Sequence, residues 1–80
     1  MRLTFIINGE DTLVEADQDA PIEGARDWAL VASRNTGRPP ETWDVRSRRG
    51  EMLNPAAAPA ALGLVDGDRL FLVLQVGAGG

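Results

Sequence analysis

One stretch with a helical period, placed between stretches with a strand period, most constrains how this chain can fold. Residues 19–37 repeat apolar side chains three and four positions apart, which predicts an amphipathic helix. The stripe consists of Ile22, Ala25, Trp28, Ala29 and Ala32. The flanking segments instead follow a period of two, or are apolar at every position, so the helix must pack on a sheet. The expected class is α+β.

Two hairpins are predicted around this helix. Residues 1–8 (MRLTFIIN) and 12–17 (TLVEAD) read as paired strands, joined by a turn at "GED" (residues 9–11) in which Gly9 supplies a positive φ. Residues 41–53 read as a second hairpin with a very short return strand at Met52 and Leu53. The inward-facing residues of the strands are expected to be Leu3, Phe5, Ile7, Val14, Ala16, Trp43 and Val45.

The ends of the helix also have sequence signals. Asp19 is a candidate N-cap, and Pro21 suits the first turn, where a missing N–H costs no hydrogen bond. Gly37 is a natural stop. Both tryptophans, Trp28 and Trp43, are expected in the core or at its edge.

The last strand, "RLFLVLQV", is apolar on both faces. Such a strand is typical of the centre of a sheet, or of a sheet whose far face is a docking surface. The order β-β-α-β-β-β with a central last strand is a β-grasp arrangement. We therefore predict a single β-grasp domain over residues 1–76, a mixed sheet of four to five strands on one helix, followed by a flexible glycine-rich tail over residues 77–80.

Composition argues against several classes of function. The 80 residues contain no Cys and no His, which removes the usual zinc ligands and a thiolate nucleophile, so we expect neither an enzyme nor a metal site. A net charge of −4 disfavours nucleic acid as a partner. No apolar run is long enough for a membrane span, and a strand pattern starts directly after Met1, so we expect a cytoplasmic protein without membrane contact.

All eight basic residues are arginine. A GC-rich genome would favour arginine codons and explains this without reference to function. The alternative is that a protein handled by lysine-modifying enzymes lacks lysine itself, which leaves Met1 as the only amine acceptor on the chain.

The segments "PIEGARDWALVA", "GRPPE", "LGLVDGD" and "DRLFLVLQVGAGG" together resemble the ubiquitin-like superfamily over nearly the whole chain. The ending "GAGG" after the last strand is similar to the diglycine tail of ubiquitin, of bacterial ubiquitin-like modifiers, and of the sulfur carriers of thiamin and molybdopterin synthesis. A terminal glycine pair alone is a weak signal, because a tail without function can also contain glycine. Its position directly after a strand that is apolar on both faces favours a functional tail.

The resemblance implies that Gly80 is adenylated at its carboxylate and conjugated, with Gly79 beside it, while Gly77 and Ala78 give the tail flexibility. Strand parity predicts that Phe71 and Val73 point away from the helix side, and the resemblance implies that they form a partner-binding surface with Gln75 and Arg46. The implied partners are an activating enzyme, a conjugating enzyme, a metallo-isopeptidase and target proteins. The chain itself needs no cofactor, because ATP is used by the activating enzyme, and it is expected to be a monomer when free.

Three functions remain open from the sequence. The first is a protein modifier joined through Gly80 to amines of target proteins. The second is a sulfur carrier that ends in a thiocarboxylate and supplies sulfur to a cofactor or a tRNA. The third is a non-covalent binding module that uses the face around Phe71 and Val73 and has an idle tail. Deleting Gly79 and Gly80 would separate the third from the other two.

Overall fold

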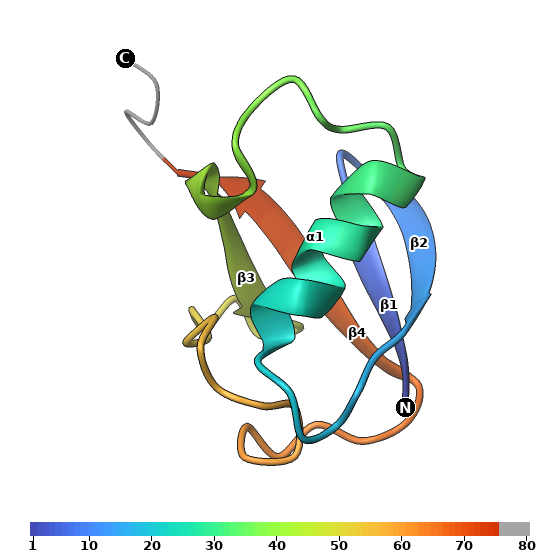
Figure 1. Ribbon diagram of the computed structural model, residues 1–80, viewed down its shortest axis with the longest axis vertical. Helices are drawn as coiled ribbons and strands as arrows, with labels where there is room; N and C mark the ends of the chain where they lie inside the picture. The colour runs from blue at the N-terminus through green and yellow to red at the C-terminus, as the bar shows by residue number, and fades with distance from the viewer. Residues whose placement is uncertain (76–80) are drawn as a thin grey trace.

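A computed structural model describes residues 1–75 of the chain (Figure 1). One α-helix packs across one face of a sheet. The elements in chain order are β1 (Arg2–Ile7), β2 (Glu10–Glu15), α1 (Ile22–Ala32), the short 3-10 helix η1 (Pro40–Thr42), β3 (Trp43–Ser47) and β4 (Asp68–Leu74).

The sheet has the strand order β2-β1-β4-β3. β4 pairs in parallel with β1 and antiparallel with β3, so the last strand lies between the first strand and the third. In Figure 1, α1 crosses in front of the sheet and covers its central strands. This is a single β-grasp domain with a mixed four-stranded sheet, which confirms the predicted fold class.

The first hairpin differs from the prediction in its turn. Asn8 and Gly9 both have positive φ, 52° and 81°, and Glu10 already pairs with Ile7 as the first residue of β2. A two-residue turn with positive φ at both positions matches the right-handed twist of the strands, and Asn-Gly is its preferred sequence. The turn is therefore Asn8-Gly9 rather than "GED", and Asp11 is a strand residue.

The start of α1 corrects the predicted cap. The helix begins at Ile22 with Pro21 in the N-cap position, and no side chain caps it. The orphan N–H groups of Ile22 and Glu23 instead donate to the carbonyl oxygens of Ala57 and Pro55, at 2.9 and 3.0 Å. A loop that is distant in the sequence thus caps the helix in place of Asp19. The N–H of Asp19 itself donates to the Asp17 carboxylate.

The end of α1 comes five residues before Gly37. The helix ends at Ala32, and Arg34 takes the left-handed conformation with φ 63°. The N–H of Arg34 donates to the Val31 carbonyl at 3.1 Å, and that of Asn35 to the Leu30 carbonyl at 2.8 Å. This pair of bonds is a Schellman motif, which normally carries glycine at the position of Arg34.

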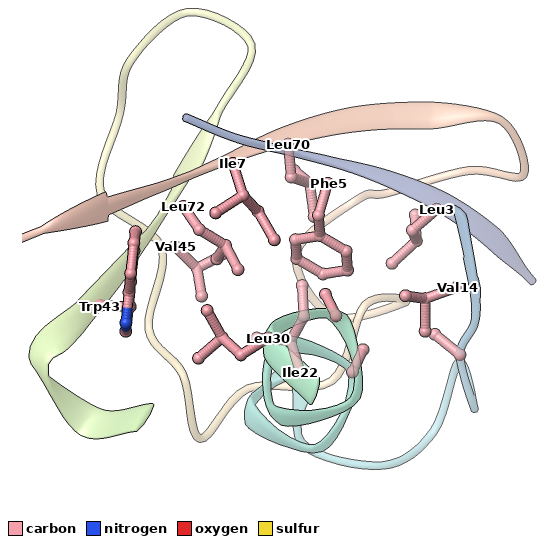
Figure 2. Packing of buried hydrophobic residues seen from close by; sticks show 13 residues of the cluster. Leu3, Phe5, Ile7, Val14, Ile22, Leu30, Trp43, Val45, Leu70 and Leu72 are labelled. Carbon is pink, nitrogen blue, oxygen red and sulfur yellow. The ribbon is translucent and has the colours of Figure 1, made fainter. Parts of the chain in front are cut away.

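The core lies between α1 and the covered face of the sheet, with Phe5 close to the helix residues Ile22 and Leu30 (Figure 2). Its strand residues agree with the prediction. The buried apolar residues are Leu3, Phe5, Ile7, Val14, Ala16, Ile22, Ala25, Ala29, Leu30, Trp43, Val45, Leu70 and Leu72.

The helix face is rotated from the predicted one. Trp28 is 69% exposed and Ala32 is exposed, whereas Arg26 and Leu30 are buried. The helix positions turned to the sheet are therefore 22, 25, 26, 29 and 30, which still follow a spacing of three and four. The prediction that Trp28 belongs to the core was wrong, and for Trp43, which is 5% exposed, it was right.

The return of the second hairpin is a single bridge between Arg46 and Met52, with the N–H of Leu53 donating to the Val45 carbonyl at 2.8 Å. The chain then crosses below α1 in a series of turns, and Leu62 and Leu64 pack against the core. Within residues 1–75, no helix has both the length and the apolar character needed to span a membrane.

Candidate functional site

The face of the sheet opposite α1 is open, and it carries the predicted partner-binding residues of β4 and β3. Leu70 and Leu72 point to the core, so Phe71 and Val73, which alternate with them, lie on the open face. Phe71 is half-buried and Val73 is 42% exposed. In the register, Arg46 is opposite Phe71.

A row of side chains crosses this face through Phe71. Ile6 of β1 pairs with Phe71, Phe71 pairs with Arg46 of β3, and Arg46 bridges to Met52. Met52 is 62% exposed. Because residues paired across a sheet point to the same face, Ile6 and Met52 extend the apolar surface on both sides of Phe71. We call Ile6, Phe71, Val73 and Met52 the open-face patch.

Ile6 and Met52 were not predicted to belong to this surface. Ile6 breaks the alternation of the first strand, which indicates an apolar residue on the open face. Met52 could be placed only with the register of the second hairpin. That register depends on the turn at residues 47–50, where the Gly50 N–H donates to the Ser47 carbonyl at 2.8 Å.

Arg46 is held in place on this face. Its guanidinium donates to the Gly50 carbonyl oxygen at 2.9 Å and lies 3.7 Å from the Asp44 carboxylate. Asp44 belongs to β3 and Gly50 to the turn that follows it, so both contacts hold Arg46 to its own hairpin. Arg46 therefore forms a fixed basic rim beside Phe71 rather than a freely rotating charge.

Gln75 fixes the point at which the chain leaves the sheet. Its N–H donates to the Thr42 carbonyl at 2.9 Å. Its side-chain amide donates to the Glu41 carbonyl at 3.1 Å and to the Asp44 carboxylate at 3.0 Å. The amide predicted to contact partners is thus bonded to η1 and β3, and what it does in the structure is anchor the end of β4. Figure 1 shows this end next to η1.

The proposed conjugation residues Gly79 and Gly80, and the tail residues Gly77 and Ala78, lie outside the described residues. Within residues 1–75, no group of three or more His, Cys, Asp or Glu side chains is placed to hold a metal ion. The described residues form an apolar patch with a basic rim on the open face, and Val73 of this patch is two residues before the anchoring Gln75.

Comparison with solved structures identifies the fold. The chain is similar to the ubiquitin of Caldiarchaeum subterraneum with a TM-score of 0.76 and 20% identity, covering 94% of this chain and 92% of that one. It is also similar to the EccD5 ubiquitin-like domain from Mycobacterium xenopi, with a TM-score of 0.73 and 25% identity, covering 92% of each chain.

A chain from the structure of ATBAG1 in complex with HSP70 is similar with a TM-score of 0.79 and 11% identity, covering 99% of this chain and 42% of that one. The first two likenesses are to a ubiquitin and to a ubiquitin-like domain. They support assignment to the ubiquitin-like superfamily, as the sequence motifs predicted.

Among curated proteins, the chain is 29% identical over 80 residues to the uncharacterized protein y4jI of Sinorhizobium fredii (strain NBRC 101917 / NGR234), and it spans 62% of the length of that relative. A family model described as "Protein of Unknown function (DUF2604)" matches residues 1–80. The chain therefore belongs to the DUF2604 family, and its fold is that of the ubiquitin-like superfamily.

Proposed function

We propose that this ubiquitin-like protein is a protein modifier, activated at the carboxylate of Gly80 and joined to amines of target proteins. The observation that carries the proposal is the anchoring of β4 by Gln75. Three hydrogen bonds fix residue 75 to η1 and β3, and five residues, four of them small, separate this point from the Gly80 carboxylate.

The small residues of segment 76–80 suit adenylation of the Gly80 carboxylate. An activating enzyme has to bring a carboxylate to the α-phosphate of ATP, and glycine lets the walls of an active site approach the backbone closely. In a longer form of the protein, cleavage after Gly80 would produce the same carboxylate. The domain would supply the substrate group and the surface by which enzymes recognise it.

The proposed reaction has three steps. The Gly80 carboxylate attacks the α-phosphorus of ATP, which forms an acyl adenylate and releases pyrophosphate. A cysteine thiolate of the activating enzyme attacks the acyl carbon and releases AMP, which leaves a thioester. The amine of a target then attacks the thioester, loses a proton and releases the thiolate, so that an amide forms.

The open-face patch is the surface we assign to enzyme recognition. Its four apolar residues are exposed or half-buried on one face, and Arg46 forms a basic rim beside them. Apolar residues surrounded by a charged rim are the usual composition of a docking surface. Val73 of the patch is two residues before the anchoring Gln75, so an enzyme bound to the patch would be close to the exit of the chain from the sheet.

Incubation of the purified protein with ATP and an extract of its native host tests the proposal. We expect ATP-dependent adducts of two kinds, one cleaved by a thiol reductant because it is a thioester, and one resistant because it is an amide. Deleting Gly79 and Gly80 should remove both. Failure of every adduct in an extract with ATP, or adducts that persist after the deletion, would contradict it.

The patch is tested in the same extract with Phe71→Ala combined with Val73→Ala. This pair should lower the rate of thioester formation about tenfold or more, because apolar anchors at the centre of an interface dominate its binding energy. Val65→Ala is the matched control: Val65 is also an exposed valine, 62% accessible, but lies outside the patch, and its loss should leave the rate unchanged.

A further inference from the structure

A second surface of the domain is formed by the groove between α1 and β2, on the helix side of the sheet. The groove has a volume of about 580 Å³ and continues past Trp28 into a smaller hollow beside β2. Most of the residues that line it are apolar, and they belong to the loop before α1, to α1 itself and to the crossing loop. They are Ala16, Ala20, Pro21, Ile22, Ala25, Trp28, Val31 and Pro59.

Trp28 is the most unusual residue of this groove. It lines both hollows and is nevertheless 69% exposed, and Val31, one helical turn away, is 59% exposed. Large aromatic side chains are normally buried, because each removes a large apolar area from water. A binding partner that covers the exposed indole would remove a large apolar area from water, which favours binding at this groove.

The backbone beside the groove is also open. β2 is an edge strand of the sheet. Met1 and Ala16 exchange two hydrogen bonds of 2.7 Å, and along an antiparallel pair such bonded residues alternate with unbonded ones. The N–H and C=O groups of Leu13 and Glu15 are therefore directed away from β1, toward the free edge, where an extended chain can pair with them.

The rim of the groove is acidic. Glu15, Asp17 and Asp27 line it, and none of the described lining residues is basic. Two of these carboxylates have an arginine partner at 3.0 Å, Glu15 with Arg2 and Asp27 with Arg26. The Asp17 carboxylate accepts only the Asp19 N–H among the described contacts. A second copy of the chain would bring a like-charged rim to this one, so charge favours a basic occupant.

We propose that the groove between α1 and β2 binds an extended segment of a partner protein, in which lysine or arginine residues flank large apolar ones. The segment pairs with the backbone of Leu13 and Glu15, places an apolar side chain against Trp28, and directs its basic residues to Asp17 and Asp27. The groove and the open-face patch lie on opposite sides of the sheet. This proposal is thus independent of the chemistry proposed for Gly80.

Selection of random dodecapeptides displayed on phage against the 80-residue protein tests this proposal. We expect the enriched peptides to combine lysine or arginine with large apolar residues. In NMR spectra, a synthetic enriched peptide should shift the amide signals of residues 13–17 and the indole signal of Trp28, and leave those of Phe71 and Val73 unchanged.

Two sets of variants locate the site. Trp28→Ala should weaken binding of the enriched peptide about tenfold or more, and because Trp28 is largely exposed, the fold should be retained. Asp17→Asn with Asp27→Asn should weaken it roughly threefold and reduce its salt dependence. The matched control, Glu41→Gln with Glu51→Gln, makes the same change in charge at exposed sites outside the groove and should have no effect.

Four results would overturn the proposal. These are the absence of enrichment, enrichment of acidic peptides, peptide binding that Trp28→Ala leaves unchanged, and self-association of the protein that Trp28→Ala abolishes. The last would mean that a second copy occupies the groove. None of them bears on adduct formation through Gly80, which the deletion of Gly79 and Gly80 tests separately.

Discussion

At the residue scale, backbone conformation distinguishes two glycines that have equal space around them. Gly24 lies inside α1, and Gly67 precedes β4 with a φ of +90°. A Cβ added at either position would meet nothing within 4 Å. Any difference between their alanine variants must therefore come from the backbone.

We expect Gly24→Ala to raise the free energy of unfolding by about 0.5–1 kcal/mol, since alanine is the better helix former and restricts the unfolded chain. Gly67→Ala should lower it by about 1–2 kcal/mol, since a Cβ is disfavoured in the left-handed region. Urea unfolding followed by fluorescence measures both. A loss of stability in Gly24→Ala would show that its side-chain space is not open.

The sequence predicted single residues well where they alternate along strands. Strand residues such as Leu3, Phe5, Ile7 and Val45 could be assigned to the core, because a period of two leaves only two possible faces. Trp28 could not be placed in this way. A helix allows a continuous range of rotations, and the apolar character of Trp28 shifted the predicted stripe away from Leu30 and the buried Arg26.

At the scale of elements, the end of α1 holds a side chain where glycine is preferred. Arg34 has a φ of 63° in the Schellman motif. Arg34→Gly should raise the free energy of unfolding by about 1 kcal/mol, because it removes the strain of a Cβ in this conformation. Arg48→Gly is the control at an exposed arginine without positive φ, and should be neutral or destabilising. Equal effects of the two would contradict this explanation.

The start of α1 depends on the rest of the molecule. Its first N–H groups bond to carbonyls of residues 55 and 57, and the helix has only 11 residues. Isolated helices shorter than about 12–15 residues are marginal in water. We expect a synthetic peptide of residues 19–37 to show no substantial helical signal in far-UV circular dichroism at 25 °C. A strong helical spectrum would mean that the local sequence alone specifies α1.

The same long-range contact explains why the cap was predicted wrongly. Asp19 has the side chain and the position of a capping residue, but the carbonyls of Pro55 and Ala57 come from a segment about thirty residues further along the chain. Local signals in the sequence could not reveal that this loop passes below the helix. The early end of the helix at Ala32 was missed for a different, local reason: an arginine in the left-handed conformation leaves no sequence signal.

At the scale of the whole molecule, the fold class was predictable because one helix, an N-terminal hairpin and a doubly apolar last strand fit few architectures. The strand order β2-β1-β4-β3 agrees with that expectation. The candidate surface was predictable in part: strand parity placed Phe71 and Val73 on the open face. The groove beside Trp28 could not be predicted. It is formed by three segments, one of them distant in the sequence, and local patterns do not reveal how such segments pack together.

The central claim is that Gly80 becomes joined to other proteins, and mass spectrometry of the tagged protein recovered from its native host tests it most directly. We expect peptides in which the Gly80 carbonyl is amide-linked to a lysine side chain or an N-terminus of another protein, and their loss when Gly79 and Gly80 are deleted. Recovery of the protein only in free form, with an unmodified Gly80 carboxylate or with one terminal oxygen replaced by sulfur, would contradict it.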